Sequence, residues 1–340
     1  MEVSQMSNLN TIYHYCSIDT FMAIIQNRCL RLCDLNKTND YMEKKWSAKL
    51  IESSAPVNLL KEELKIFDIN MNLTEDYWYE DGVNNHLQYY DKEIKNVLYN
   101  NRPILITCFS KEKDLLSQWR AYGQDGEGIA LGFNYKILKQ LNRKDSNMKF
   151  TSKNISVEEV VYKENKQKEK LSALIQGCIM YIQNMFEDDM VKISDDFSEY
   201  FTEEFDAFCE VLVDNLENIS CTIKNTAFSE EKEVRIVYDP QLVSREVTGN
   251  FSLNEINEQF KRTKEKNNFI INPIKYTKKL NQLVAFCDLD FSKLIEENII
   301  NEIIIGPKSN ISEDDIYNFM LSQGYDANNI KIKHSKATYR

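Results

Sequence analysis

Short segments of alternating hydrophobic and polar residues run along the chain, and two long stretches with a helical period interrupt them. Alternation predicts strands. The expected strands cover or lie within residues 12–17, 29–35, 103–110, 128–133, 149–162, 232–238, 267–276, 280–289, 298–307 and 329–340. Helical patterns fill residues 36–101 and 164–226, and shorter ones occupy residues 18–28, 115–123, 134–143 and 312–324. Dispersed strands with helical blocks between them indicate a single α+β domain over 1–340, with helical insertions at about 40–100 and 164–226.

Composition narrows the class of protein. The chain has 340 residues, of which 42% are hydrophobic, so it can bury a sizeable core. Only 9 glycines and 5 prolines occur, which favours long regular elements over a glycine-rich β-barrel. The formal net charge is -11 at pH 7. A surface of this sign repels a phosphate backbone, so broad binding to duplex nucleic acid is not expected, whereas a local groove for a few nucleotides is compatible with it.

The sequence carries no pattern typical of export, of a membrane segment or of a metal site. Residues 1–10 have neither the basic nor the apolar stretch of a signal peptide. The longest apolar runs are shorter than the roughly 20 residues that a spanning helix needs. The eight cysteines form no CxxC pair, and the three histidines are scattered along the chain. A cytoplasmic protein with reduced cysteines, no membrane contact and no metal is therefore expected.

One stretch, ILITCFSKEKDLLSQWRAYGQDGEGIALGF at 104–133, is dense in aromatic residues and glycines. A short helix carrying Trp119 and Tyr122 is followed by a loop with Gly126 and Gly128. Glycine lets a ligand approach the backbone closely, and aromatic rings provide flat surfaces for stacking. The alternative is structural: a helix C-cap, a turn, and Trp119 as part of the core.

Two further candidates lie in other expected strands. Glu231, Glu233 and Arg235 stand at the start of a strand, where alternation puts them on one side. A carboxylate beside an arginine is a candidate catalytic pair, although a charged run is more often a solvated face. His14 lies in the first expected strand and, taken alone, is more typical of a hydrogen-bonded core histidine.

Three common motifs are absent. GQDGEG at 123–128 is not GxGxxG, and it precedes a strand rather than a helix. GPKSN at 306–310 lacks the spacing of a P-loop, and no GxSxG occurs. A Rossmann dinucleotide fold is therefore not expected.

Together these residues resemble a widespread bacterial family of uncharacterised domains. The shared pattern begins with IYHYCS and CLRLCDL, continues with CFS…D…W..YG..G.G.ALGF and E.EVR, and ends with IIIGP, a helix and Ser335 to Arg340. That family in turn resembles the ADP-ribosyltransferases, which bind NAD without a Rossmann fold. The resemblance implies an α+β fold with a split mixed or antiparallel β-sheet core of the ADP-ribosyltransferase type, NAD as a substrate, and no metal.

By this resemblance, the three signature positions fall on His14, on the region 107–122, and on Glu233 or Glu231. His14 would hydrogen-bond the adenosine-side ribose, and the carboxylate would stabilise an oxocarbenium-like ribose. The central strand has alanine where the polymerase-like enzymes have tyrosine. Either Tyr122 or Trp119 would therefore stack on nicotinamide, or the site would resemble the Ser-type branch of the family through Ser110. The other residues expected to line the NAD site are Tyr15, Phe109, Ser110, Gly126, Gly128 and Arg235.

The implied activity is transfer of ADP-ribose from NAD to a macromolecular acceptor, which is nucleic acid (RNA or DNA) or protein. Such enzymes act as bacterial toxins or anti-phage defence effectors and often have a neutralising antitoxin protein as partner. Two alternatives use the same fold. One is a non-catalytic nucleotide-binding or sensor module, and the other is an NAD glycohydrolase, in which water is the acceptor.

Overall fold

The computed structural model describes residues 10–37, 46, 49–50, 103–142, 155–189, 215–216, 219–240, 269–279 and 281–339. Its strands are β1 (Thr11–Cys16), β2 (Cys29–Asp34), β3 (Leu105–Ser110), β4 (Ile129–Asn134), β5 (Ile155–Glu159), β6 (Glu233–Tyr238), β7 (Ile270–Ile271), β8 (Lys275–Lys279), β9 (Gln282–Asp290), β10 (Ile300–Ile305) and β11 (Lys331–His334). Its α-helices are α1 (Ile18–Asn27), α5 (Leu116–Ala121), α6 (Tyr135–Leu138), α7 (Glu164–Asp189) and α11 (Glu313–Ser322). Short 3-10 helices, among them η2 (Gln124–Gly126) and η4 (Thr226–Glu231), connect them.

The described strands form one mixed sheet in an α+β protein. Along its main path the order is β11-β10-β4-β1-β3-β2-β9-β7, with β6 beside β3, β5 beside β6, and β8 beside β9. Within this part of the chain, β10 and β11 pair in parallel and the other named pairs are antiparallel. The class and the mixed sheet are as the sequence predicts.

The sheet branches at β3. One edge of β3 pairs with β6 along six residues, from Leu105 opposite Tyr238 to Ser110 opposite Glu233. The other edge meets β1 at its C-terminal end, where Tyr13 lies opposite Ser110. At its N-terminal end the same edge meets β2 instead. The C-terminal end of β3 is therefore the place where β1, β3 and β6 lie side by side.

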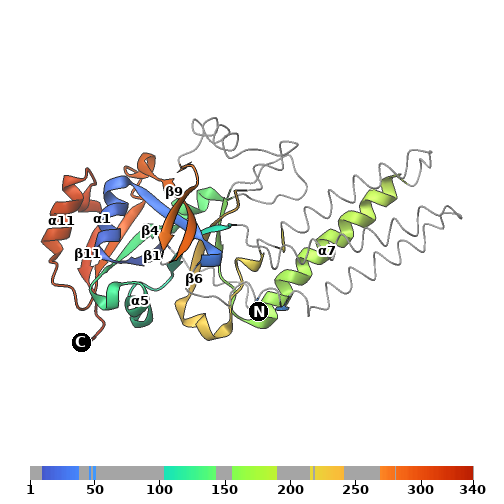
Figure 1. Ribbon diagram of the computed structural model, residues 1–340, viewed down its shortest axis with the longest axis horizontal. Helices are drawn as coiled ribbons and strands as arrows, with labels where there is room; N and C mark the ends of the chain where they lie inside the picture. Colours follow the sequence, from blue (N-terminus) through green and yellow to red (C-terminus); the bar gives the residue numbers. More distant parts are fainter. Residues whose placement is uncertain are drawn as a thin grey trace, which may run out of the picture.

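Each face of the sheet has its own cover. The main core face carries Ile12, Phe109 and Val234 and packs against α1 and α11, whose rings Phe21 and Phe319 are 5.6 Å apart. Figure 1 shows these two helices next to each other beside the sheet, with α5 on a different side. Trp119 of α5 belongs to a separate buried cluster with Tyr13, Tyr15, Ala130 and Ile304. We call the face that carries Tyr13 and Tyr15 the site face.

Local sequence explains the helices that cover the sheet. Ser17 caps α1 by accepting a hydrogen bond from the Thr20 amide. Ser312 and Asp315 form a reciprocal capping box at the start of α11. In contrast, α7 runs away from the sheet (Figure 1). No helix in the described ranges has both the length and the apolar character needed to cross a membrane.

Several predicted boundaries are wrong, each for a local reason. The helical pattern was expected to continue through 226, but Ile223 forms a parallel bridge with Val161 and η4 follows. The strand expected over 267–276 is divided into β7 and β8 around Pro273, which cannot donate to a ladder. The last strand ends at His334 rather than at 340. Most of the helical insertion expected at about 40–100, and much of the later part of 164–226, lie outside the described residues.

Candidate functional site

Register places three polar side chains in a row on the site face. Tyr13 of β1 lies opposite Ser110 of β3, and Ser110 lies opposite Glu233 of β6. Directly opposed residues of antiparallel strands project to the same face. Glu233 is the first residue of β6 because Lys232 adopts a left-handed conformation, with φ 45°, and ends η4. The candidate site is therefore built where η4 turns into β6.

Glu233 is held as an anion. Its Oε1 accepts from Arg235 Nε at 2.9 Å, and its Oε2 accepts from Arg235 Nη2 at 2.9 Å. Lys224 Nζ lies 3.3 Å from Oε2. Burial acts to raise the pKa of this carboxyl, but the two cations outweigh burial and lower the pKa to about 2. Glu233 is thus ionised throughout the neutral range and is not a proton donor there.

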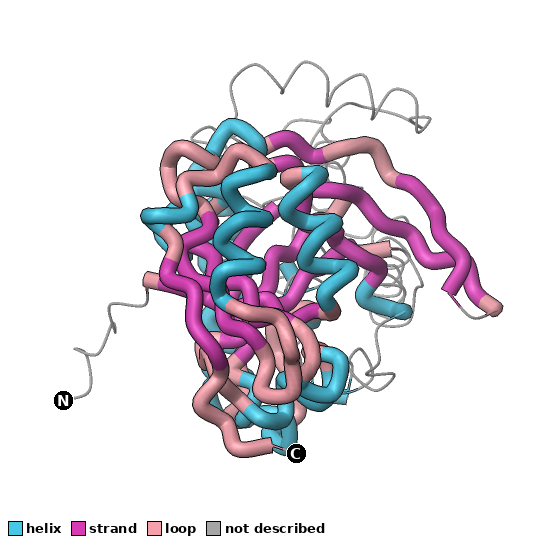
Figure 2. The backbone as a smooth tube through the Cα atoms, turned by 90° about the vertical axis from the view of Figure 1, so that its left-hand side faces the viewer, coloured by secondary structure: helices cyan, strands magenta, loops and turns pink. Residues whose placement is uncertain are grey.

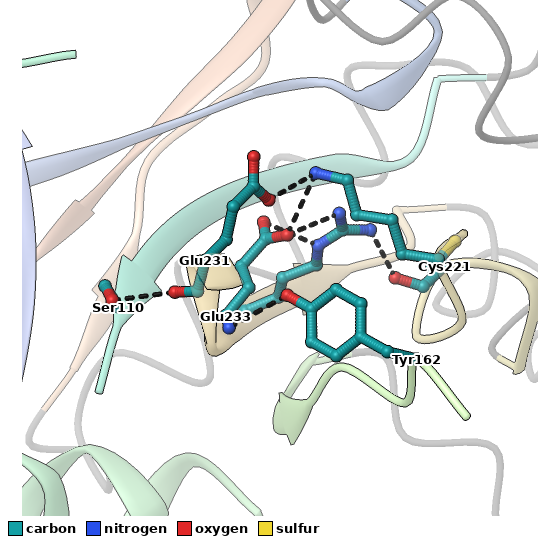
Figure 3. A network of polar contacts seen from close by, with 7 residues as sticks. Ser110, Tyr162, Cys221, Glu231 and Glu233 are labelled. Atoms are coloured by element: carbon teal, nitrogen blue, oxygen red, sulfur yellow. Dashed lines mark hydrogen bonds and ion pairs between the residues drawn. The ribbon is translucent and has the colours of Figure 1, made fainter. Parts of the chain in front are cut away.

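Glu231 occupies the same cluster in a different electrostatic state. Lys224 Nζ donates to its Oε2 at 2.7 Å, and burial, reinforced by the charge of Glu233, raises its pKa against the effect of Lys224. Figure 3 shows the carboxylates of Glu231 and Glu233 close together, both joined to the amine of Lys224. We call Lys224, Glu231, Glu233 and Arg235 the charged cluster. It contains two anions and two cations, so its buried charges balance.

Distant segments of the chain hold the charged cluster in place. Arg235 Nη1 donates to the carbonyl of Cys221 at 2.7 Å, and the Glu233 amide donates to Tyr162 Oη at 3.0 Å (Figure 3). Gln167, in the first turn of α7, donates to the Lys224 carbonyl at 2.8 Å. The segment before η4 is therefore fixed between α7 and β6, and it delivers Lys224 to the carboxylates.

Ser110 has a positioning contact rather than an open hydroxyl. It is buried, its Oγ donates to the Glu231 carbonyl at 2.7 Å, and the same oxygen accepts from the Glu112 amide at 3.1 Å. Figure 3 shows the contact with Glu231. Ser110 thereby joins the end of β3 to the turn that carries both carboxylates.

Two partly exposed rings lie near the charged cluster. Tyr122, at the C-cap of α5, has 43% of its surface exposed, and burial together with the charge of Glu231 raises its pKa to about 12. Phe228 of η4 is 38% exposed, and Lys224 Nζ lies 4.8 Å from the centre of its ring. The expected Tyr122 is thus accompanied by Phe228, which the sequence did not suggest.

His14 projects to the main core face. It alternates with Tyr13 and shares its side of β1 with Ile12 and Cys16, both part of the main core. Its Nδ1 donates to the Cys108 carbonyl at 2.9 Å, and its ring lies 5.8 Å from that of Phe109. Burial lowers the pKa of the imidazole. Glu233 projects to the opposite face, since Val234 is in the main core. The structure therefore does not bring His14 and Glu233 together.

The glycines of the 123–128 loop face the chain itself. A Cβ on Gly128 would lie 2.2 Å from the Cys16 carbonyl oxygen, and one on Gly126, at φ 91°, would contact Pro307 and Tyr339 at 3.2 Å. Close backbone packing therefore explains why both positions are glycine. This packing accounts for them without the ligand contact that the sequence suggested.

Trp119 and Tyr15 are also used in packing. The Trp119 ring is fully buried, 4.8 Å from that of Tyr15, and its indole N–H donates to Asp114 Oδ1 at 2.8 Å. Tyr15 Oη donates to the Glu112 carbonyl at 2.7 Å and accepts from the Leu115 amide at 3.0 Å. Tyr122 and Trp119 were the two rings expected to stack on nicotinamide, and of this pair Tyr122 is the exposed one.

Of the residues expected to line an NAD site, Glu231, Glu233 and Arg235 lie together, with Ser110 and Tyr122 around them. Lys224 and Tyr162 were missed: the first lay in a segment with a helical pattern, and the second gave no signal beyond closing a strand. Across the described residues, no group of three potential His, Cys, Asp or Glu metal ligands occurs.

One protein family matches part of this chain, whereas no curated protein and no solved structure matches it. Residues 118–236 match a family described as "Protein of unknown function (DUF2971)". The matched segment extends from α5 into β6 and contains the whole charged cluster together with Tyr122, so the candidate site of this chain lies in the part that is similar to a domain family of unknown function.

Proposed function

We propose that the protein is an NAD-dependent ADP-ribosyltransferase in which the charged cluster is the catalytic centre. The observation that carries the proposal is a buried Glu233 that is ionised in the neutral range and is held by Arg235 and Lys224 close to the partly exposed rings of Tyr122 and Phe228. Buried charges contribute little net stability compared with apolar packing. Strongly shifted carboxyl groups beside exposed aromatic residues are more typical of a functional site.

The chemistry follows from the two states of the carboxyl groups. When the bond between nicotinamide and ribose breaks, nicotinamide leaves with the electron pair and positive charge develops on the ribose C1′ and ring oxygen. Glu233, as a fixed anion, stabilises that charge. An acceptor oxygen or nitrogen then bonds to C1′, and its proton passes to Glu231, whose raised pKa suits proton transfer. Tyr122 and Phe228 stack on the nicotinamide ring.

His14 has no role in this proposal, because its side chain lies on the opposite face of the sheet from Glu233. Tyr13, which is in register with Ser110 and Glu233, is the nearest counterpart that β1 offers on the site face. The acceptor is a macromolecule, and water as acceptor would make the enzyme an NAD glycohydrolase.

The test is incubation of the purified protein with NAD labelled in the adenylate part and bacterial extract, with nicotinamide release measured in parallel. We expect label on macromolecules, a loss of roughly 10²–10³-fold in rate for Glu233→Gln, and a smaller loss for Glu231→Gln. Glu159→Gln is the matched control, since it removes a carboxylate from β5, opposite Val234 and on the main core face. A folded wild-type protein that releases no nicotinamide, or a fully active Glu233→Gln, contradicts the proposal.

A second candidate is a binding module without turnover. It is favoured by one observation: both oxygens of Glu233 are already engaged by Arg235 and Lys224. This candidate predicts a thermal shift with NAD or ADP-ribose that Tyr122→Ala abolishes, with no nicotinamide release. Free ADP-ribose as the sole labelled product would instead identify the glycohydrolase.

A further inference from the structure

The hairpin of β8 and β9 extends the sheet at the edge remote from the charged cluster. The two strands pair over five residues, from Lys275 opposite Phe286 to Lys279 opposite Gln282. β9 continues into the sheet through β2, whereas β8 pairs with β9 alone among the described strands. Figure 2 shows two long strands that project beyond the helices at the right of the view. Every side chain of β8 is exposed.

This hairpin is locally basic in an acidic protein. Lys275, Lys278 and Lys279 are exposed, and residues 275–287 contain no Asp or Glu, while the whole chain carries -11. Within the described part of the molecule, none of the three lysines forms an ion pair. By contrast, Lys111, Lys166 and other surface lysines are paired with carboxylates. The positive charge of the hairpin is therefore available to an external anion.

Large side chains stand among these lysines. The register places Tyr276 opposite Ala285 and Lys278 opposite Leu283, so Tyr276, Lys278 and Leu283 share one face of the ribbon. Tyr276 is 59% exposed and Leu283 is 70% exposed. On the opposite face Lys275 lies in register with Phe286, over which the Arg31 guanidinium stacks at 4.0 Å. Phe286 is buried beneath Arg31, so the exposed ring of the hairpin is that of Tyr276, on the face that also carries Lys278 and Leu283.

We propose that the β8–β9 hairpin binds single-stranded nucleic acid. Proteins that bind single strands combine cations for the backbone with aromatic side chains on which bases stack. Lysines alone would be explained by protection of an edge strand from pairing with another chain. That explanation does not require Tyr276 and Leu283 to be exposed beside them. A duplex is disfavoured because the acidic remainder of the molecule repels its denser charge.

The binding surface stands independently of the transferase chemistry, because it needs no NAD. A role of the hairpin in binding the ADP-ribose acceptor rests on the proposed function. In that role, the acceptor is a nucleic acid strand rather than a protein. The hairpin and the charged cluster lie towards opposite ends of β3, since Cys33 of β2 lies opposite both Phe286 of β9 and Ile106, near the start of β3. A strand of several nucleotides, not a single nucleotide, would be needed to reach both.

The experiment measures fluorescence anisotropy of a labelled single-stranded 12-nucleotide RNA and its DNA equivalent without NAD, over a range of salt concentrations. The triple variant Lys275→Gln, Lys278→Gln, Lys279→Gln is expected to raise Kd more than tenfold and to reduce the slope of log K against log salt by about 2. Tyr276→Ala is expected to raise Kd by about fivefold to a hundredfold with the slope unchanged. The control triple Lys163→Gln, Lys166→Gln, Lys168→Gln makes the same charge change at exposed positions at and near the start of α7.

Three results overturn the inference: no binding at low salt, equal losses in the two triple variants, or equal affinity for poly-glutamate with no effect of Tyr276→Ala. The last would identify a general anion or acidic-peptide surface. Nicotinamide release by the hairpin variants separates the two proposals. Hairpin variants that lose RNA binding but release nicotinamide normally support this inference. A wild-type protein that binds RNA but releases no nicotinamide also supports it and contradicts only the proposed transferase activity.

Discussion

Two polar networks lie at the site face of the sheet, and they differ in burial and in the sequence separation of their members. The charged cluster is buried, consists of two carboxylates and two cations, and takes three of its four members from residues 231–235. The second network, which we call the C-terminal clamp, joins Asp114 and Asp125 to Ser335, Lys336, Tyr339 and Lys308. Its partners are far apart in sequence, and the Asp125 end of it is exposed.

The C-terminal clamp explains the structure of the aromatic and glycine-rich stretch at 104–133. Asp114 accepts hydrogen bonds from the Trp119 indole, the Ser335 hydroxyl and the Lys336 amide at 2.8, 2.5 and 2.6 Å. Asp125, in a left-handed conformation at φ 53°, is held by Lys308 at 2.7 Å and by Tyr339 at 2.6 Å. The comparison teaches that the aromatic and glycine-rich stretch is mainly an anchoring structure, while the less distinctive run at 231–235 supplies most of the charged cluster that we propose as the catalytic centre.

The largest expected effect comes from removing one member of the charged cluster. Glu233→Ala leaves Arg235 and Lys224 buried without their shared anion, which costs about 3–5 kcal/mol of unfolding free energy. Urea denaturation measures the loss. Glu159→Ala, which breaks a half-exposed pair with Lys111, is the control and is expected to cost less than about 1 kcal/mol. Equal losses in the two variants would show that the buried cations do not depend on Glu233.

The second prediction concerns the acid dependence of the charged cluster. The folded pKa of Glu233 is about 2, and an unpaired Glu titrates near about 4.3. Its contribution to stability is therefore present above about pH 4.3 and is lost as the pH falls toward 2. Glu231 has a raised pKa and acts with the opposite sign: its contribution is present below its unfolded pKa and is lost as the pH rises through its folded value. Wild-type stability measured from pH 5 to 2 should fall more steeply than that of Glu233→Gln. Identical slopes would contradict the assignment.

Much of the fold could be predicted because its signals are local. The alternation in EVRIVY predicts β6 and the shared face of Glu233 and Arg235, and local helical patterns predict α1 and α11 within residues 18–28 and 312–324. These features need only the next few residues. Pairing partners do not follow from local pattern, since a shift of one residue reverses every side chain. The register of Tyr13 with Ser110 is what turns His14 away from Glu233.

The missed site residues depend on contacts that no local pattern contains. Lys224 lies in a segment with helical periodicity, but the bridge between Val161 and Ile223 and the side chain of Gln167 pull it into the site. Phe228 follows in η4 as an isolated aromatic residue. In the glycine loop, the partner of Asp125 is Tyr339, more than 200 residues away. Such partners become visible only when the chain is folded.

The clamp should respond more weakly than the charged cluster. Asp114→Ala removes the acceptor of three hydrogen bonds and leaves the buried Trp119 indole N–H without its partner, which costs about 2 kcal/mol. The measurement is urea unfolding, compared with Asp314→Ala, an exposed acidic residue in the first turn of α11. A loss in Asp114→Ala as large as that of Glu233→Ala would reverse the ranking of the two networks.

The smallest effect separates anchoring from global stability. Tyr339→Phe keeps the ring against Gly126 and Lys308 but removes the hydroxyl that donates to Asp125. We expect the amides of Gly126 and Gly128, which both donate to the Gly123 carbonyl, to exchange hydrogen several-fold faster, with the unfolding free energy unchanged within about 0.5 kcal/mol. Tyr317→Phe removes a comparable hydroxyl contact, to Asn328 at 3.0 Å, and should leave those amides unaffected. Faster exchange throughout the sheet would mean that the C-terminal segment stabilises the whole fold; unchanged exchange at both glycines would mean that it does not anchor the loop beside Tyr122.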